Sequence, residues 1–195
     1  MAGMTLTEKI MARASRRDHV APGQLLWADI HTVMTMDYLG KSTFEAFAAL
    51  GVPEVFRRDR VICVSDHLVP PPTAHFATML NEWRVLVKQH RIEHFYDLGR
   101  QGIAHQVMVE NGHVLPGTIS IGTDSHANTY GAVGAMGNAV GVTDAAVAMA
   151  IGKCWFRVPE TVRFHIRGAW PSWVMAKDLS LHVMGMMHWN GHLIY

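Results

Sequence analysis

Cysteine is scarce in this sequence, with two residues, Cys63 and Cys154, among 195. They lie far apart in apolar sequence, which favours a reduced, cytoplasmic protein over a disulfide-stapled scaffold. Long uninterrupted apolar runs are also missing. The least polar stretch, residues 132–152, contains Asn138, Thr143 and Asp144 and is crowded with glycine. We therefore expect no transmembrane helix.

An excess of charge of either sign is lacking as well. The chain has 17 Lys and Arg against 16 Asp and Glu, a formal net charge of +1. This balance argues against a broad basic face, so we expect neither a nucleic-acid nor a membrane partner. Glu8, Lys9 and Arg13 break the apolar character that a signal peptide would need near the N-terminus. With 49% hydrophobic residues the chain is expected to form one domain over residues 1–195.

Apolar residues follow a pattern that predicts helices and strands in alternation. Two capping boxes, Thr5-Leu6-Thr7-Glu8 and Ser42-Thr43-Phe44-Glu45, indicate helix starts. Further helices are predicted from Thr73 to beyond Val87 and over residues 139–152 and 176–187. Predicted strands cover residues 24–36, 60–65, 92–98, 118–122 and 161–166. This alternation is typical of a layered α/β fold.

Three polar groups stand out because they fall where α/β sheets place ligands, in loops beyond the carboxyl ends of strands. They are Asp66-His67, His105-Gln106 and Asp124-Ser125-His126. A carboxylate that orients one imidazole nitrogen leaves the other nitrogen to donate or accept a proton, which suits addition or elimination of water. Each histidine taken alone is better explained as a residue that satisfies its loop. Three such groups in succession favour acid/base chemistry.

A glycine-rich stretch, YGAVGAMGNAVG, follows the third group and contains Gly131, Gly134, Gly137 and Gly141. Backbone N–H groups of such a turn can bind an anion, and a carboxylate qualifies as well as a phosphate. The stretch matches neither the dinucleotide motif nor the phosphate loop. Close packing of a helix against a sheet explains the later glycines at least as well.

Residues 102–168 carry the most specific signature. Asp124-Ser125-His126 precedes the glycine-rich stretch, with His105-Gln106 and Pro116-Gly117 before it. This arrangement strongly resembles the aconitase superfamily, specifically large subunits of the 3-isopropylmalate dehydratase and homoaconitase type. The resemblance runs from Thr5 to about Gly191 and implies a three-layer α/β/α fold with a mostly parallel sheet.

What the resemblance implies is a hydro-lyase that dehydrates and rehydrates a hydroxy-di- or tricarboxylic acid, with 3-isopropylmalate in leucine biosynthesis as the first choice. The complete enzyme would use a 4Fe-4S cluster and a small subunit that carries a swivelling domain. The implied catalytic residues are Asp66, His67, His105, Asp124 and His126. The implied substrate-binding residues are Ser125, Asn128 and Asp37.

The sequence departs from the family at two places. Thr35-Met36-Asp37 stands where relatives usually carry Thr-His-Asp, which makes Asp37 a weaker candidate. The three cluster-binding cysteines of the family lie downstream of the matched region, and Cys63 and Cys154 do not match them. Thiolate ligation of a cluster needs those side chains, so we expect no metal ligands within this chain and a domain that stops before the cluster-binding region.

Two other hypotheses remain open on the sequence alone. In the first, the chain is a non-catalytic relative that serves as a carboxylate-binding or regulatory module. In the second, it is a hydratase with a histidine-bound mononuclear metal. The remaining histidines are expected to pack or to face solvent, and a metal site near the C-terminus is disfavoured because its histidines lack a carboxylate partner. These residues are His75, His90, His94 and His165, and His182, His188 and His192 near the end. Met184, Met186 and Met187 are expected to fill a core.

Overall fold

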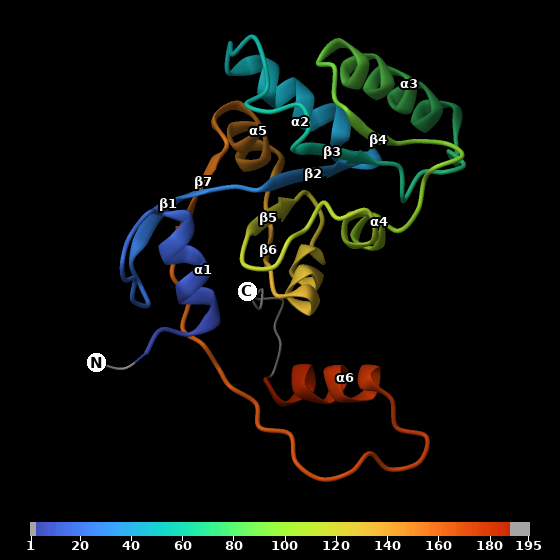
Figure 1. Cartoon of the computed structure of the whole chain (residues 1–195). Helices are drawn as coiled ribbons and strands as arrows, with labels where there is room; N and C mark the ends of the chain where they lie inside the picture. Colours follow the sequence, from blue (N-terminus) through green and yellow to red (C-terminus); the bar gives the residue numbers. More distant parts are fainter. Residues whose placement is uncertain (1–2, 188–195) are drawn as a thin grey trace. The chain divides into compact units, whose positions relative to one another are not determined.

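The computed structural model describes residues 3–187. Two compact units divide the chain, residues 1–160 and 161–195, and each is described by itself. A five-stranded sheet lies at the centre of the first unit, with the order β4-β3-β2-β5-β6 and every neighbouring pair parallel (Figure 1). Its strands are β2 (Thr32–Met36), β3 (Val61–Val64), β4 (His94–Tyr96), β5 (Ile119–Gly122) and β6 (Met136–Ala139).

Helices cover both faces of this sheet (Figure 1). One face carries α2 (Asp37–Ala49), α3 (Ala74–Gln89) and α5 (Val142–Ile151). The other carries α4 (Ala104–Glu110) and the 3₁₀ helix η1 (Ala127–Val133). Two separate apolar clusters fill the layers, one containing Phe44 and Trp83 and the other Met108 and Tyr130. The predicted three-layer α/β/α fold with a parallel sheet is confirmed.

Strands β2, β3 and β5 are buried along their whole length, because helices lie on both sides of them. This explains why β3 appears in the sequence as a short continuous apolar run instead of an alternating one. The strand predicted over residues 92–98 is shorter, since β4 lies at an edge of the sheet and pairs only with β3.

Helix starts agree with two of the three predicted caps. The helix α1 (Leu6–Ala14) begins at a capping box, in which the backbone N–H of Glu8 donates to Thr5 and that of Thr5 donates to Glu8. Thr73 caps α3. The capping box predicted at Ser42 is wrong, because α2 already starts at Asp37 and the hydroxyl of Thr43 donates to the carbonyl of Leu39 inside the helix.

The long strand predicted over residues 24–36 is two strands. Strand β1 (Leu25–Asp29) forms a separate antiparallel ribbon with β7 (Lys153–Arg157), and only β2 enters the main sheet. The helix predicted from residue 139 begins at Val142, because the residues before it form β6. Strands β6 and β7 and helix α4 were not predicted from the sequence; the glycines around β6 and the short length of α4 hide their periodicity.

The second unit contains α6 (Ala176–Met186). The strand predicted over residues 161–166 is wrong: these residues have no regular structure, and no strand among residues 3–187 pairs with them. Met184, Met186 and Met187 are exposed, so the prediction that they fill a core is also wrong. His188 and His192 lie outside the described residues.

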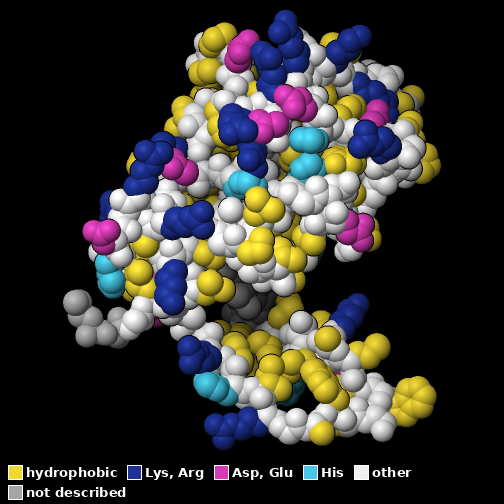
Figure 2. Space-filling view, viewed as in Figure 1, with side chains coloured by type: hydrophobic (Ala, Val, Ile, Leu, Met, Phe, Trp, Pro, Cys, Tyr) yellow, Lys and Arg dark blue, Asp and Glu magenta, His cyan; other side chains and the backbone are white. Residues whose placement is uncertain are grey.

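On the face shown in Figure 2, Lys and Arg side chains lie among Asp and Glu, in keeping with the balanced net charge. Ion pairs such as Lys41–Glu45 and Arg58–Glu54 link residues of opposite charge at the surface. Among residues 3–187, no helix is long and apolar enough to cross a membrane.

Candidate active site

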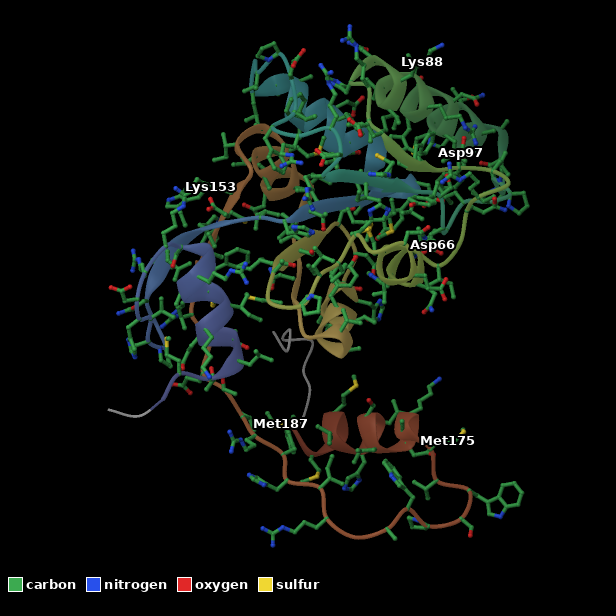
Figure 3. The ribbon with its side chains drawn as sticks, in the orientation of Figure 1. Asp66, Lys88, Asp97, Lys153, Met175 and Met187 are labelled. Atoms are coloured by element: carbon green, nitrogen blue, oxygen red, sulfur yellow. The ribbon has the colours of Figure 1, made fainter. Side chains whose placement is uncertain are left out.

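Three neighbouring parallel strands place carboxylates at the carboxyl edge of the sheet, the side at which the strands end. Asp37 directly follows β2, Asp66 follows β3 and Asp124 follows β5, and β2 lies between the other two strands. Figure 3 shows Asp66 and Asp97 beyond the ends of β3 and β4 at this edge. The predicted loops are therefore brought together at the carboxyl ends of the strands, where open α/β sheets bind ligands.

His105 and Asp124 form a close polar pair at this edge. The Nε2 atom of His105 lies 2.6 Å from Oδ1 of Asp124, and both side chains are largely buried. The other ring nitrogen, Nδ1, lies 3.3 Å from the hydroxyl of Tyr130. An ionised carboxylate only accepts hydrogen bonds, so Nε2 carries a proton, and in the neutral ring Nδ1 accepts from the tyrosine.

The charge of Asp124 is stabilised by its partners. Burial acts to raise the pKa of Asp124, but hydrogen bonds from His105 and from the backbone N–H of His126, at 2.8 Å, outweigh it and hold the pKa below its usual value. Burial and the nearby charge of Asp124 raise the pKa of Tyr130. The site thus contains a fixed carboxylate anion and a phenol that stays protonated.

His126 and Ser125 form the open side of this group. The His126 side chain is 79% exposed, and its Nδ1 atom lies 3.4 Å from Oδ1 of Asp124 and 3.3 Å from the Ser125 hydroxyl. Asn128 follows in the exposed part of η1. These side chains are within reach of a small molecule that approaches the edge from solvent.

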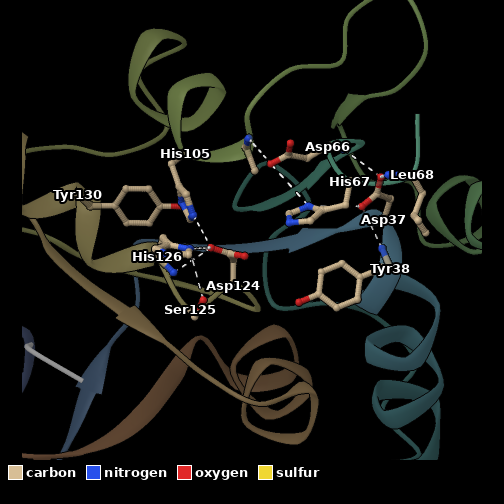
Figure 4. A network of polar contacts seen from close by, with 11 residues as sticks. Asp37, Tyr38, Asp66, His67, Leu68, His105, Asp124, Ser125, His126 and Tyr130 are labelled. Carbon is tan, nitrogen blue, oxygen red and sulfur yellow. Dashed lines mark hydrogen bonds and ion pairs between the residues drawn. The ribbon is translucent and has the colours of Figure 1, made fainter. Parts of the chain in front are cut away.

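The second acid/base group lies on the loop after β3. The Nδ1 atom of His67 is 3.8 Å from Oδ2 of Asp66, and the ring, 45% exposed, packs edge-on against Tyr38 with centroids 5.1 Å apart. Oδ2 of Asp66 also accepts a hydrogen bond from the backbone N–H of Ala104, at 2.8 Å. Figure 4 shows the ring of His67 turned toward the group of His105, Asp124 and His126.

Asp37 and its neighbour Met36 are both fully buried. Oxygens of Asp37 accept hydrogen bonds from the backbone N–H groups of Tyr38, Asp66 and Leu68 (Figure 4). Met36, for which the family resemblance implies a histidine, packs in the apolar cluster on the α4 side of the sheet.

The glycine-rich stretch serves packing at one position and leaves open space at two others. A Cβ atom on Gly137 would overlap the backbone carbonyl of Ala127, whereas nothing lies within 4 Å of one on Gly131 or Gly141. Gly134 ends η1 in the left-handed conformation, with φ of 74°. Close approach of β6 to η1 therefore requires glycine at residue 137.

Two kinds of side chain that can bind metals occur in the described residues, a histidine–carboxylate group and the two cysteines. Ligand atoms of His105, Asp124 and His126 lie within 4.8 Å of one another, close enough to converge on one metal ion. The cysteines do not fit a 4Fe-4S cluster: both are buried, Cys63 in β3 and Cys154 in β7, in different sheets. Burial raises the pKa of both thiols, to about 11 for Cys154, whereas cluster ligands are thiolates.

Sequence reasoning missed two contributors to this edge. Tyr130 touches His105 from 25 positions along the chain, and the backbone N–H of Ala104 binds Asp66 from 38 positions along it. No local pattern marks either contact, because each depends on how α4 packs beside β3 and η1. A tyrosine within the glycine-rich stretch was the one available signal.

Comparisons with known proteins agree with this fold. A family profile described as "Aconitase family (aconitate hydratase)" matches residues 8–193. A protein of Methanothermobacter thermautotrophicus named "Probable 3-isopropylmalate dehydratase large subunit" is 43% identical over 96% of this chain and 45% of its own length. Proteins named 3-isopropylmalate dehydratase large subunit from Thermodesulfovibrio yellowstonii and Pyrococcus abyssi are each 42% identical, over 94% and 98% of this chain and 44% and 45% of their own lengths.

The chain thus spans less than half the length of the curated relatives it matches. The family profile nevertheless extends over almost the whole chain, and the relatives are near 40% identical over nearly all of it. The chain belongs to the aconitase family.

Proposed function

We propose that this chain supplies acid/base loops of a hydro-lyase that dehydrates and rehydrates a hydroxy-di- or tricarboxylic acid, with 3-isopropylmalate as the substrate. The observation that carries the proposal is the buried pair of His105 and Asp124, 2.6 Å apart, beside the exposed His126. Such pairs hold a proton at a fixed place, which the loss and return of water require.

Elimination of water breaks a C–H bond and a C–OH bond. The electron pair of the C–H bond forms the alkene, and the hydroxyl leaves as water once it receives a proton. We assign this protonation to His67, since its ring is half exposed and a carboxylate lies 3.8 Å away. His105 and Asp124 hold His126 and Ser125 at the substrate. Asn128 is proposed to contact the substrate beside them. In rehydration the same groups act in reverse.

Other parts of the catalytic unit, the cluster and the base, are proposed to belong to other segments or subunits. The cysteines of this chain do not fit a 4Fe-4S cluster, so the cluster expected for the family would be bound by a different segment. The relatives are named large subunits, which supports a small-subunit partner that supplies the base for the C–H proton. We propose that residues 1–195 form one aconitase-like domain within that unit. Its two buried, free cysteines fit a reducing compartment such as the cytoplasm.

A segment exchange tests this function. The matching N-terminal part of the Methanothermobacter thermautotrophicus relative is replaced by this chain, and the chimera is combined with a small subunit under anaerobic conditions. We expect alkene formation from 3-isopropylmalate and slower or no reaction with homocitrate and citrate. A chimera that folds and assembles but dehydrates none of the three acids would overturn the proposal; preference for another acid would overturn the choice of substrate.

A further inference from the structure

Asp37 occupies a central place in the loops of the candidate active site. It is the first residue of α2 and directly follows β2, the strand between β3 and β5. Its side chain has no exposed surface. A substrate that approaches from solvent therefore cannot reach this carboxylate without displacing the protein around it.

Both oxygens of Asp37 are occupied by backbone donors. Oδ2 accepts from the N–H groups of Asp66, at 3.0 Å, and Leu68, at 2.7 Å, and Oδ1 accepts from Tyr38, at 3.0 Å. Burying a carboxylate is costly unless such partners replace its water, and the amino end of a helix adds a favourable field. The donors from Asp66 and Leu68 flank His67, so a single carboxylate oxygen fixes the backbone on both sides of that histidine.

The contacts continue from this loop to the other acid/base group. The side chain of Asp66 accepts a hydrogen bond, at 2.8 Å, from the backbone N–H of Ala104. Ala104 is the first residue of α4. The next residue is His105, whose ring meets Asp124. Carboxylates thus connect the loops after β2, β3 and β5 in sequence: Asp37 holds the β3 loop, Asp66 holds α4, and Asp124 holds His105.

From these contacts we propose that Asp37 is a positioning residue, which fixes the His67 loop and, through Asp66, the start of the helix that carries His105. This role differs from the direct substrate contact that the family resemblance implies for Asp37. A positioning role for Asp37 rests on the function proposed for the site, whereas the ordering of the loops is a property of the chain by itself and can be measured without substrate.

Backbone amide hydrogen exchange of this chain, followed residue by residue by NMR, tests the proposal. In Asp37→Ala we expect exchange at Asp66, Leu68 and Ala104 to accelerate on the order of tenfold or more, relative to the buried β3 amides of Ile62 and Val64. Asp37→Asn keeps one oxygen that can accept both loop amides, so its acceleration is expected to be smaller, and it carries the test if the alanine variant does not fold.

The matched control is Asp97→Ala, which removes a carboxylate after β4 that accepts from the Ser65 hydroxyl. It should leave the amide of Ala104 unchanged. A general loss of stability would accelerate Ile62 and Val64 as much as the loop amides, and that result would overturn the proposal. Unchanged exchange at Ala104 in Asp37→Ala would also overturn it, because the effect would then stop at the first loop. Neither result depends on whether the complete enzyme is a dehydratase.

Discussion

The imidazole of His105 is held between an anion and a phenol: Nε2 lies 2.6 Å from Oδ1 of Asp124, and Nδ1 lies 3.3 Å from the hydroxyl of Tyr130. The two partners come from the loop after β5 and from η1, and they fix both the orientation of the ring and the position of its proton. A histidine restrained in this way keeps the Asp124 carboxylate in one orientation, as the role proposed for the pair requires.

Replacing Asp124 by asparagine tests the energetic weight of this arrangement. The carboxylate accepts from His105 and from the backbone N–H of His126, and hydrogen bonds to charged groups contribute about 1.5–3 kcal/mol each. The carboxamide retains part of these contacts, so we expect Asp124→Asn to lower the free energy of unfolding by about 1–3 kcal/mol. Urea denaturation measures this, with Asp18→Asn, an exposed acid in the turn after α1, as a control. Equal stability of both variants would show that the pair contributes nothing.

Stability should fall as the solution is acidified, because of two histidines remote from the candidate site. Burial, and then the charge of Arg60, lowers the pKa of His31 to about 4; burial, and then His94 and Arg60, lowers that of His113 to about 4. The unfolded chain takes up these protons below the usual value of 6.5, whereas the folded chain does not until about 4. The stabilisation is therefore complete above pH 6.5 and is lost as the pH falls toward 4.

We expect the two histidines together to account for about 1–3 kcal/mol across that interval, since one pKa unit corresponds to about 1.4 kcal/mol and solvent near His31 reduces its share. Thermal unfolding of the chain and of His113→Gln, measured over this pH range, isolates the effect from that of the carboxylates. The variant should show a shallower decline with acid. Parallel curves would contradict the assignment.

Gly137 is expected to tolerate no side chain. A Cβ atom there would overlap the carbonyl of Ala127, a backbone atom that cannot move aside as a flexible side chain can. We expect Gly137→Ala to cost about 2 kcal/mol or more in unfolding free energy. Gly131→Ala is the matched control, because nothing lies within 4 Å of its added methyl group. A cost for Gly131→Ala equal to that for Gly137→Ala would contradict the packing explanation.

The two thiols are expected to be unreactive in the folded chain. Cys63 is completely buried and Cys154 nearly so, and burial raises the pKa of both. A thiol reagent should therefore modify them only after denaturant is added, and incubation with iron and sulfide should give no visible absorption of a cluster. Rapid labelling, or a cluster that survives desalting, would contradict this account of the cysteines.

The sequence predicted the fold best where local and global preferences coincide. The caps at Thr5 and Thr73 and the buried strands β3 and β5 need no knowledge of distant contacts. The prediction failed where a partner decides: residues 161–166 alternate apolar and polar side chains, yet a strand needs a neighbour, and none of the described strands pairs with them. Likewise, Ser42-Thr43-Phe44-Glu45 matches a cap motif but lies inside α2, which already starts at Asp37.

The candidate site was predictable in part for the same reason. Asp66, His67 and Asp124 follow apolar strands, so their place at the carboxyl edge could be inferred from the pattern alone. The family resemblance implied that His105 and Asp124 are catalytic. The contact of His105 with Tyr130 was expected from neither the pattern nor the resemblance, because it depends on the packing of α4 against η1. The burial of Asp37 depends on β2 lying between β3 and β5, an order that differs from the order of the strands in the sequence.

The most direct test of the central claim is the rate of alkene formation from 3-isopropylmalate by the segment-exchange chimera, compared between Asp124→Asn and Asp18→Asn at equal content of folded, assembled protein. If the pair of His105 and Asp124 holds His126 and Ser125 at the substrate during the acid/base reaction, Asp124→Asn lowers kcat on the order of 100-fold or more while Asp18→Asn keeps the parent rate. Equal rates for the two variants would contradict the claim.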